Sequence, residues 1–307
     1  MTIRLEGYID LPEHRGTGGF DHAAVHRGLR RLYVAHTAND ALDVIDLDKS
    51  IHVESVDGLT GVAGVLVAEP WDLVIASNRG EDTVAICDAR DPRSLVKVPV
   101  GVRPNGLAFD PVRRTLLVAN VGDPLDPTKH TLSVVNTDRA RLTVSIPVPG
   151  RTRWTVFDQT TDAFLVNVAD PPSIVVVGAR DPTHIVRTID IPAAGPHGLD
   201  VDQRGAVYCA CDAGRLLVLE PPTYAVLAGL PLAGSPDVIV LDSALHHAYV
   251  AIGDPGVIEV FDVDRLERLE SVATEPGAHT IAIDAGQHRV YAFLPTTHRV
   301  AVFQARS

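Results

Sequence analysis

The stretch Leu32-Tyr33-Val34-Ala35-His36, followed by Asp43-Val44-Ile45-Asp46, has the pattern of two short strands joined by a polar loop. Versions of it return along the whole chain. The hydrophobic pair that marks each copy begins near Tyr33, Val74, Leu117, Phe164, Tyr208, Tyr249 and Tyr291, at successive spacings of 41, 43, 47, 44, 41 and 42 residues. Repeats of this length with several short strands each are typical of β-propellers, in which every repeat forms one four-stranded blade. The sequence therefore predicts an all-β fold, a seven-bladed β-propeller with antiparallel blades.

The two ends of the chain predict how the ring closes. Residues 2–10 alternate like a strand but precede the first full repeat, whereas the last repeat supplies three strands, at 280–284, 289–294 and 299–304. We expect the N-terminal strand to complete the last blade as its outer strand, because this leaves no open blade edge. Since each blade buries its faces against its neighbours, we expect one propeller domain over residues 1–307.

Charge and hydropathy disfavour several classes of partner. The chain has 39 acidic and 27 basic residues, a formal net charge of -12, and no run rich in Lys and Arg. A nucleic acid or an acidic membrane surface is therefore not an expected partner. No stretch reaches the 18 or so apolar residues of a membrane span, and the N-terminus lacks the apolar core of a signal peptide. We expect a soluble, monomeric, cytoplasmic protein, or an exported one if a signal has been removed.

Acidic residues recur at the ends of the expected strands. Five of them end an inner strand: Asp110, Asp158, Asp202, Asp242 and Asp284. A carboxylate at this position can accept hydrogen bonds from the backbone of the following turn. Because they repeat at hairpins, we interpret these acids as turn caps and not as a catalytic cluster.

The repeat resembles a known family. Leu32–His36 with Val44–Asp46, and Leu117-Val118-Ala119-Asn120 with Val134-Val135-Asn136, are similar to the YVTN-type β-propeller repeat. The resemblance covers essentially the whole chain, although Gly178 replaces the usual acidic turn residue in one repeat. It implies a seven-bladed propeller but no single activity, because propellers host lyases, lactonases, electron-transfer proteins and pure binding scaffolds.

The register of the repeat brings one position of each blade to the mouth of the central channel. Five residues before the end of each inner strand stand Asp21, Ala63, Asn105, Arg153, His197, Asp237 and His279. We call these seven the ring residues. Six of them are polar or ionisable, and rotation about the axis makes them converge, so they should shift one another's pKa values and attract a polar ligand or a cation. Among them we predict His197, His279, Asp237 and Arg153 as catalytic residues. A solvated channel lining without function is the alternative.

Other residues are expected to surround this mouth. The next position along the inner strand gives His22 and Trp154, and the loops after the second strands give His36, Asn120 and Asn167, with Arg79 and Asp212 at equivalent places. With Asn105, the predicted substrate-binding set is His22, His36, Asn105, Trp154, Asn120 and Asn167. We expect Pro104-Asn105-Gly106 and Pro196-His197-Gly198 to form tight turns that present the middle residue. Residues 121–130 form an inserted loop in the third blade, which is either a wall of the site or a tolerated insertion.

Ligand type allows a metal at the same place. Asp21, His197, Asp237 and His279 form the predicted metal set, and His with Asp suits Zn or another first-row cation, whereas Asp and Asn alone suit Ca or Mg. One divalent ion is thus a possible cofactor. Propellers of the gluconolactonase type bind such an ion through a set that includes Glu, and no ring residue here is Glu.

Two hypotheses of function follow. The first is a metal-assisted hydrolase or lyase that acts on a small polar molecule, such as a lactone or an ester, at the channel mouth. The second is a non-catalytic propeller that binds a ligand or a partner protein through its loops.

Overall fold

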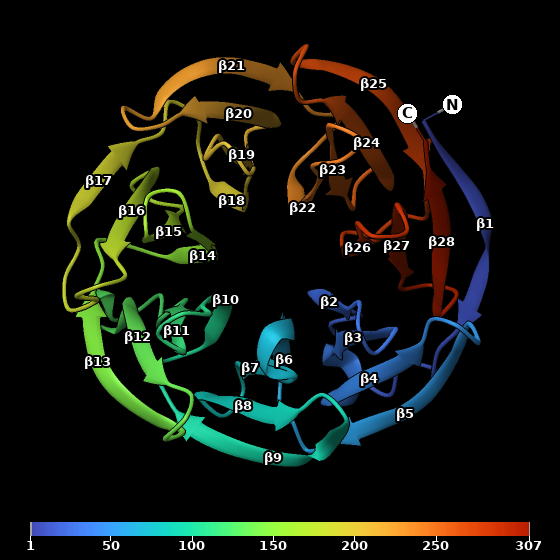
Figure 1. Cartoon of the computed structure of the whole chain (residues 1–307), viewed down its shortest axis with the longest axis horizontal. Helices are drawn as coiled ribbons and strands as arrows, with labels where there is room; N and C mark the ends of the chain where they lie inside the picture. Colours follow the sequence, from blue (N-terminus) through green and yellow to red (C-terminus); the bar gives the residue numbers. More distant parts are fainter. Residues whose placement is uncertain (1, 307) are drawn as a thin grey trace.

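The computed structural model describes residues 2–306 as seven four-stranded antiparallel sheets arranged around a central channel (Figure 1). The strands nearest the channel are β2 (Ala23–His26), β6 (Val62–Ala68), β10 (Pro104–Asp110), β14 (Thr152–Asp158), β18 (Pro196–Val201), β22 (Pro236–Asp242) and β26 (Ile281–Asp284). We number the blades one to seven by these inner strands. The predicted all-β, seven-bladed propeller is confirmed.

Each blade continues outward through three more strands. The second strands are β3 (Arg31–His36), β7 (Leu73–Asn78), β11 (Thr115–Asn120), β15 (Ala163–Val168), β19 (Val207–Cys211), β23 (His247–Ile252) and β27 (Arg289–Leu294). The third strands are β4 (Ala41–Asp46), β8 (Thr83–Asp88), β12 (Thr131–Asn136), β16 (Ser173–Gly178), β20 (Arg215–Glu220), β24 (Val257–Asp262) and β28 (Arg299–Ala305). The outer strands are β5 (Ile51–Asp57), β9 (Asp91–Pro99), β13 (Arg141–Pro147), β17 (Arg187–Asp190), β21 (Ala225–Pro231), β25 (Glu267–Ala273) and β1 (Ile3–Asp10).

The seventh blade joins the two ends of the chain. β1 pairs antiparallel with β28, with Ile3 opposite Ala305 and Asp10 opposite Arg299. The sheet order β1-β28-β27-β26 is the predicted arrangement of three C-terminal strands and one N-terminal strand. Because this pairing ties the first strand to the last, it closes the ring (Figure 1).

The hydrophobic core is divided among the spaces between neighbouring blades. Each of the seven apolar clusters combines residues of two adjacent blades. Tyr33 is fully buried between blades one and two, and its hydroxyl donates a hydrogen bond of 2.6 Å to the carbonyl of Ala89 in the second blade. The hydrophobic pairs that mark the repeat therefore build the contacts between blades and stay away from the channel.

The turn-cap interpretation of the repeated acids is confirmed. A carboxylate oxygen of Asp110 accepts from the backbone N–H of Val112 at 2.9 Å, and Asp158 accepts from Thr160 at 2.8 Å. Asp202, Asp242 and Asp284 accept in the same way from the backbone two residues on. Since these bonds hold the turn after each inner strand, these acids serve the hairpins.

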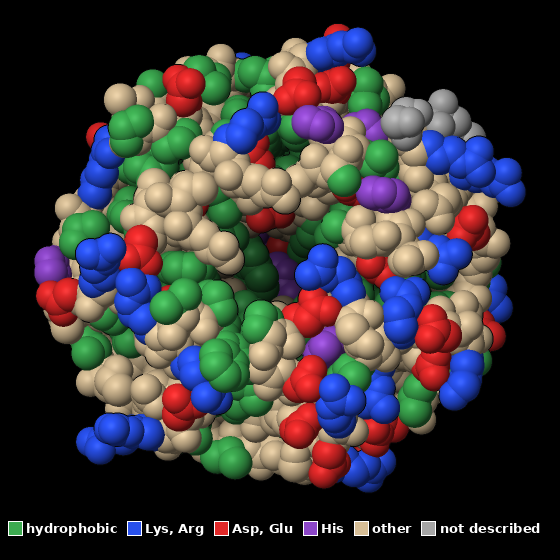
Figure 2. All heavy atoms as spheres, viewed as in Figure 1, with side chains coloured by type: hydrophobic (Ala, Val, Ile, Leu, Met, Phe, Trp, Pro, Cys, Tyr) green, Lys and Arg blue, Asp and Glu red, His purple; other side chains and the backbone are tan. Residues whose placement is uncertain are grey.

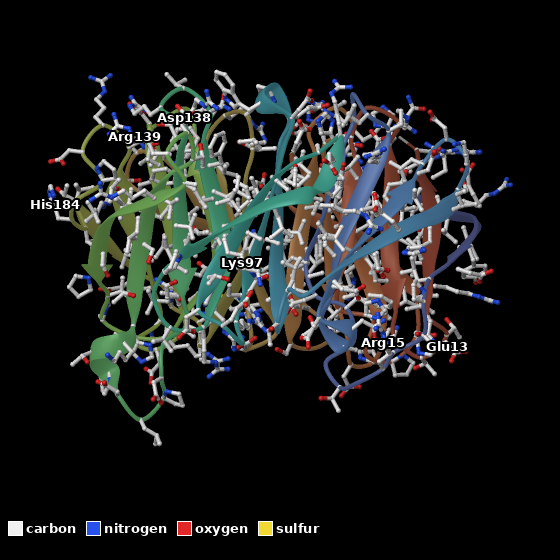
Figure 3. All side chains as sticks on the ribbon, turned by 90° about the horizontal axis from the view of Figure 1, so that it is seen from below. Glu13, Arg15, Lys97, Asp138, Arg139 and His184 are labelled. Carbon is white, nitrogen blue, oxygen red and sulfur yellow. The ribbon has the colours of Figure 1, made fainter. Side chains whose placement is uncertain are left out.

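Three short 3-10 helices lie outside the sheets: η1 (Thr37–Asn39), η2 (Glu69–Trp71) and η3 (Pro127–Lys129). η3 belongs to the inserted loop of the third blade, which projects beyond the lower face in Figure 3, while Asp138 and Arg139 mark the opposite face. We call the lower face the loop face and the opposite one the turn face. No helix within residues 2–306 is long and apolar enough to cross a membrane.

Candidate functional site

The ring residues reach the channel through irregularities of the inner strands. In β10 the register with β11 shifts between Pro104 and Leu107, so that Asn105 and Gly106 are left out of the regular pairing. Equivalent shifts occur in β6, β14, β18 and β22. A bulge of this kind re-aims side chains next to functional sites. It explains how the ring residue and its successor can both border the channel.

The predicted tight turns at Pro104-Asn105-Gly106 and Pro196-His197-Gly198 are wrong. Both segments lie within strands, β10 and β18. The glycines are required for a different reason, because a Cβ added to Gly106 would meet the carbonyl oxygen of Arg153 in the next blade at 2.6 Å. Gly106 thus allows adjacent inner strands to approach closely around the axis.

Asp237 joins the two ring histidines. Its carboxylate oxygens lie 3.0 Å from Nε2 of His197 and 2.7 Å from Nδ1 of His279. The other ring nitrogen of His197, Nδ1, lies 2.8 Å from Asp212, which also accepts a hydrogen bond of 2.8 Å from the hydroxyl of Ser235. A continuous series of alternating acidic and basic side chains therefore runs through Asp212, His197, Asp237 and His279, and we call this series the acid–base chain.

The pKa values in this chain shift in the directions that favour charge. Burial opposes protonation of His197, but Asp237 and Asp212 outweigh it and raise the pKa of His197 to about 9. The pKa of His279 is also raised, since Asp237 outweighs the effect of burial. Burial by itself would raise the pKa of Asp237, yet the two histidines hold it well below its ordinary value. At neutral pH His197 is therefore an imidazolium between the carboxylates of Asp212 and Asp237.

Two arginines, Arg153 and Arg79, contact the acid–base chain and the neighbouring ring residues. The guanidinium of Arg153 lies 3.1 Å from Nε2 of His197 and 3.3 Å from Asp212. On the other side of the mouth, Arg79 contacts Asp21 at 3.1 Å and donates a hydrogen bond of 2.6 Å to the amide oxygen of Asn105. The structure thus brings together the six polar ring residues with Arg79 and Asp212.

A cavity of about 920 Å³ opens beside this network on the loop face. Its walls include Arg103, Arg151, Arg153 and Asp212, and the inserted loop contributes Val121, Gly122, Pro124, Pro127 and His130. Of the two alternatives for residues 121–130, a wall of the site or a tolerated insertion, this position beside the cavity favours the first. We call this space the mouth cavity.

Arg103 and Arg151 set the charge of the mouth cavity. Within residues 2–306, neither guanidinium makes an ion pair or a side-chain hydrogen bond. Burial, followed by the nearby cations Arg153, Arg103 and Arg79, lowers the pKa of Arg151. The carboxylates of Asp170 and Asp212 also line the cavity, and Asp212 acts on Arg151 in the opposite direction. Because Arg103 and Arg151 nevertheless lack a paired carboxylate, their guanidinium groups can attract an anion into the cavity.

Three predicted substrate-binding residues, His36, Asn120 and Asn167, lie outside the lining of the mouth cavity. His36 is fully buried, with Nδ1 2.7 Å from Asp43 and Nε2 2.8 Å from His14. Asn120 is fully buried and donates to the hydroxyls of Thr131 and Ser133 in its own blade. None of these groups lines the mouth cavity.

Asn167, the third, acts through the backbone of the next blade. Its amide nitrogen donates to the carbonyl oxygens of His197 at 2.9 Å and of Gly198 at 3.1 Å. The side chain therefore holds the segment that carries His197 without itself reaching the mouth cavity.

His22 and Trp154 meet inside the channel. Their ring centroids are 3.7 Å apart with an interplanar angle of 31°, and His22 is buried. Burial lowers the pKa of His22, so that its imidazole is neutral against the indole. Trp154 lines a second cavity on the turn-face side and not the mouth cavity. Trp154 was predicted at the mouth, and the structure places it in the wall of this other space.

The predicted metal set does not fit a cation as the side chains stand. Both nitrogens of His197 face carboxylates, its raised pKa keeps it protonated, and a metal requires the neutral imidazole. Across residues 2–306, no group of three or more His, Cys, Asp or Glu side chains is placed to hold a metal ion. The metal therefore stays a prediction, and we derive no chemical step through it.

Sequence reasoning missed Arg103 and Arg151. A signal was present, because each stands two residues before a ring residue, Asn105 and Arg153. Applying the same repeat register two positions earlier would have placed both at the mouth. That neither guanidinium pairs with a carboxylate can be seen only in the structure.

Comparisons with known proteins place the fold only. No protein-family model matches the chain, and no curated protein matches it. Among solved structures, a chain of Kuenenia stuttgartiensis hydrazine synthase aligns with a TM-score of 0.83 at 15% sequence identity, covering 95% of this chain and 96% of that chain. At this identity the likeness shows a shared fold and nothing about activity.

Proposed function

We propose that the protein binds a small organic anion, such as a carboxylate, in the mouth cavity. The observation that carries this proposal is the pair of unpartnered guanidinium groups, Arg103 and Arg151, in the wall of a cavity of about 920 Å³. Ligand pockets for small molecules commonly have volumes of 300–1,000 Å³. A planar guanidinium binds a carboxylate through two parallel hydrogen bonds, which gives both affinity and orientation.

The walls of the cavity suit an organic molecule better than a bare inorganic ion. Alongside the arginines they present apolar groups from Val121, Pro124, Pro127 and Pro149. Such a mixture binds a molecule with a charged end and an apolar body, because the carbon skeleton gains from leaving water while the charge meets the arginines.

The neighbouring chain of acids and bases supports an enzymatic form of the same proposal. Asp212 belongs to the cavity wall and holds Nδ1 of His197, and the opposite nitrogen contacts Asp237 and Arg153. A protonated imidazole oriented by carboxylates can act as a general acid toward a leaving oxygen. Hydrolysis of a lactone or ester, or elimination from a hydroxy acid, is the reaction class we assign, with His197 as the acid.

Calorimetric titration tests the binding proposal. We expect Arg151→Ser and Arg103→Ser each to weaken binding of a mixed set of small carboxylates by about tenfold, the loss of roughly 1.4 kcal/mol expected for a charge-assisted contact. Arg139→Ser is the matched control, because Arg139 is an exposed arginine on the turn face (Figure 3). If no carboxylate binds, or if the control weakens binding equally, the proposal is wrong.

The enzymatic form needs a separate measurement. Turnover of a lactone and ester panel should fall strongly in His197→Gln while carboxylate binding persists. Elemental analysis and addition of Zn, Mn or Ca to the protein test the predicted divalent cofactor in the same assay. Turnover that is unchanged by His197→Gln would exclude His197 as the acid.

One observation favours a second candidate, the non-catalytic binding propeller. Leu125 in the inserted loop is 92% exposed, which is unusual for a large apolar side chain. A protein partner gripped by this loop should be lost in Leu125→Ser and retained in Arg151→Ser. The opposite pattern would favour the small-molecule site.

We also propose that the repeats belong to the YVTN-type family. The likeness of Leu32–His36 and Leu117–Asn120 to the YVTN-type repeat supports membership of that family. The closed ring supports a monomer, and sedimentation equilibrium tests it, because a concentration-dependent mass would contradict it.

A further inference from the structure

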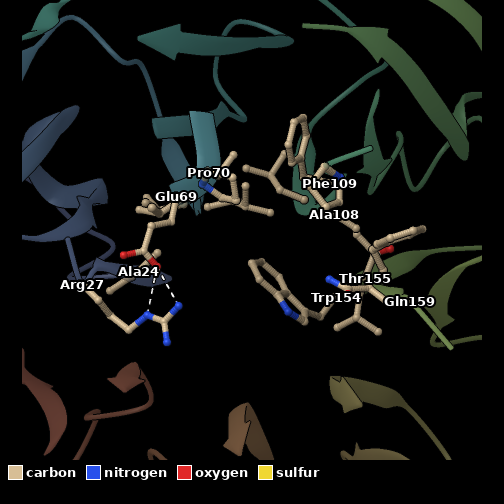
Figure 4. A pocket seen from close by; sticks show the side chains of 18 residues that line it. Ala24, Arg27, Glu69, Pro70, Ala108, Phe109, Trp154, Thr155 and Gln159 are labelled. Atoms are coloured by element: carbon tan, nitrogen blue, oxygen red, sulfur yellow. Dashed lines mark hydrogen bonds and ion pairs between the residues drawn. The ribbon is translucent and has the colours of Figure 1, made fainter. Parts of the chain in front are cut away.

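A second cavity of about 720 Å³ lies in the channel toward the turn face. Its walls come from the inner strands of the first four blades, β2, β6, β10 and β14, and from the turns that follow them (Figure 4). None of the seven ring residues lines it, and neither do Arg103 and Arg151. We call it the channel chamber. It is a separate space from the mouth cavity.

The walls of the channel chamber are mostly apolar. The partly exposed Leu66 and Phe157 line it, together with Val65, Leu107 and Phe109, which are almost fully buried in the core between the blades. Figure 2, viewed from the turn face, shows hydrophobic side chains in the central hollow, with His and acidic side chains deeper. A channel that serves only to hold water would gain nothing from such walls, since apolar surface in contact with water is unfavourable.

Trp154 gives the chamber a flat aromatic wall (Figure 4). One face of the indole packs against His22 at a centroid distance of 3.7 Å. The other tryptophan, Trp71, donates its indole N–H to the carbonyl of Pro111, whereas the indole N–H of Trp154 has no hydrogen-bond partner within residues 2–306. Trp154 therefore offers both a surface for stacking and a free donor.

Few polar groups border the chamber, and they lie at its edge. Arg27 and Glu69 form an ion pair with a distance of 2.9 Å, which Figure 4 shows as dashed lines. The side chain of Gln159 makes no hydrogen bond within the described residues. An apolar pocket with a small number of oriented polar groups is the usual composition of a small-molecule site.

We propose that the channel chamber binds a small aromatic molecule with one hydrogen-bond acceptor. The aromatic body packs between Trp154 and the phenyl groups of Phe109 and Phe157, and the acceptor meets the indole N–H or the amide of Gln159. A flat ring suits the site better than an aliphatic chain because aromatic pairs gain from stacked or edge-to-face contacts beyond the area they bury. This site is additional to the anion site of the mouth cavity and does not depend on it.

The two tryptophans provide the test. In a Trp71→Phe background, Trp154 is the remaining tryptophan, and we titrate this protein with 6-propionyl-2-(dimethylamino)naphthalene, an uncharged aromatic ketone, while following Trp154 emission. We expect saturable quenching with one dye per chain. Leu66→Glu, which places a charge in the chamber wall, should weaken dye binding by at least about tenfold. Val112→Glu is the matched control, since Val112 is an apolar residue of the same face, 82% exposed and outside the chamber.

Further variants separate a folding defect and a wrong site from the proposal. Ala24→Leu adds bulk to the chamber without adding charge, so it should also weaken dye binding if Leu66→Glu fails to fold. Because the dye is uncharged, we expect no change in Arg151→Ser, which alters the wall of the mouth cavity. Three results would each overturn the proposal. They are no quenching in the Trp71→Phe protein, quenching in Leu66→Glu and Ala24→Leu as strong as in that protein, and loss of dye binding in Arg151→Ser.

Discussion

The two ends of the channel are built from the same inner strands but differ in chemistry. At the loop face, Arg153, His197 and Asp237 form a charged network. Nearer the turn face, Leu66, Phe109 and Phe157 of the inner strands β6, β10 and β14 line an apolar chamber. Because a strand alternates its faces, a regular strand could not place two consecutive residues toward the channel, and the bulge at the ring positions makes this possible. This irregularity recurs in β6, β10, β14, β18 and β22, and the two ends differ in the residue types that border the channel, charged at the ring positions and apolar nearer the turn face.

Gly64→Ala should break this arrangement at both ends and have the largest effect. A Cβ on Gly64 would overlap the backbone carbonyl of Asn105 in the next blade. Backbone cannot move aside as a flexible side chain can, so we expect a loss of about 3 kcal/mol in the free energy of unfolding. Chemical denaturation measures this loss.

Gly7→Ala is the matched control for that variant. Gly7 lies in the outer strand β1, and a Cβ added there would meet nothing within 4 Å. Its stability should change by less than about 0.5 kcal/mol. Equal losses in the two variants would show that close approach of the inner strands is not the cause.

His197 should make the mouth sensitive to alkaline pH, with the next largest effect. Its pKa is raised from 6.5 to about 9, so its pairing stabilises the folded state fully below pH 6.5 and is lost as the pH rises through 9. The shift corresponds to about 2–3 kcal/mol between these limits. Unfolding free energies at pH 6 and pH 9.5 measure it, and His197→Gln should remove the dependence. A wild-type difference that His197→Gln leaves intact would contradict the assignment.

The repeat period and the turn-capping acids carried most of what could be predicted. Asp110 ends β10 and Asp202 directly follows β18, and counting back from them located Asn105 and His197 at the channel. The bulge was not predictable from the residues, because glycine at Gly106 fits a tight turn equally well. The role of His36 was hidden too, since its partner Asp43 comes from the next strand and the pair is fully buried. The position of a residue in the repeat thus predicts where its Cα lies in the propeller. The residues that its side chain contacts depend on the packing between strands and blades.

Asp200 lies farther along its inner strand than the ring residues, and its titration should change the free energy of unfolding less than that of His197. It stands in β18 where Ala108 and Val156 stand in β10 and β14, and it accepts hydrogen bonds from the backbone N–H groups of Val201 and Leu241. Burial raises its pKa from 3.8 to about 7, so the folded state loses stability as the pH rises from 3.8 to 7.

Asp200→Asn should abolish that loss. Asp200 is partly exposed, so solvent screens part of the effect, and we expect about 1 kcal/mol. Comparing the unfolding free energies of both proteins at pH 4 and pH 7.5 tests this. If the variant keeps the dependence of the natural protein, Asp200 is not the titrating group.

His22 should give the smallest effect, with a sign opposite to that of His197. Burial lowers the pKa of His22 below 6.5 despite the nearby Asp21 and Asp237, so its stabilising contribution is present above pH 6.5 and is lost as the pH falls through the folded pKa. Since His22 packs on Trp154, its protonation should also change Trp154 emission in the Trp71→Phe background. Acid titration of this protein and of its His22→Gln variant measures both quantities. An emission change that persists in His22→Gln would assign the acid transition to another group. If both predictions hold, protonation of His197 stabilises the fold and protonation of His22 destabilises it, because His197 lies between two carboxylates and His22 packs against an indole.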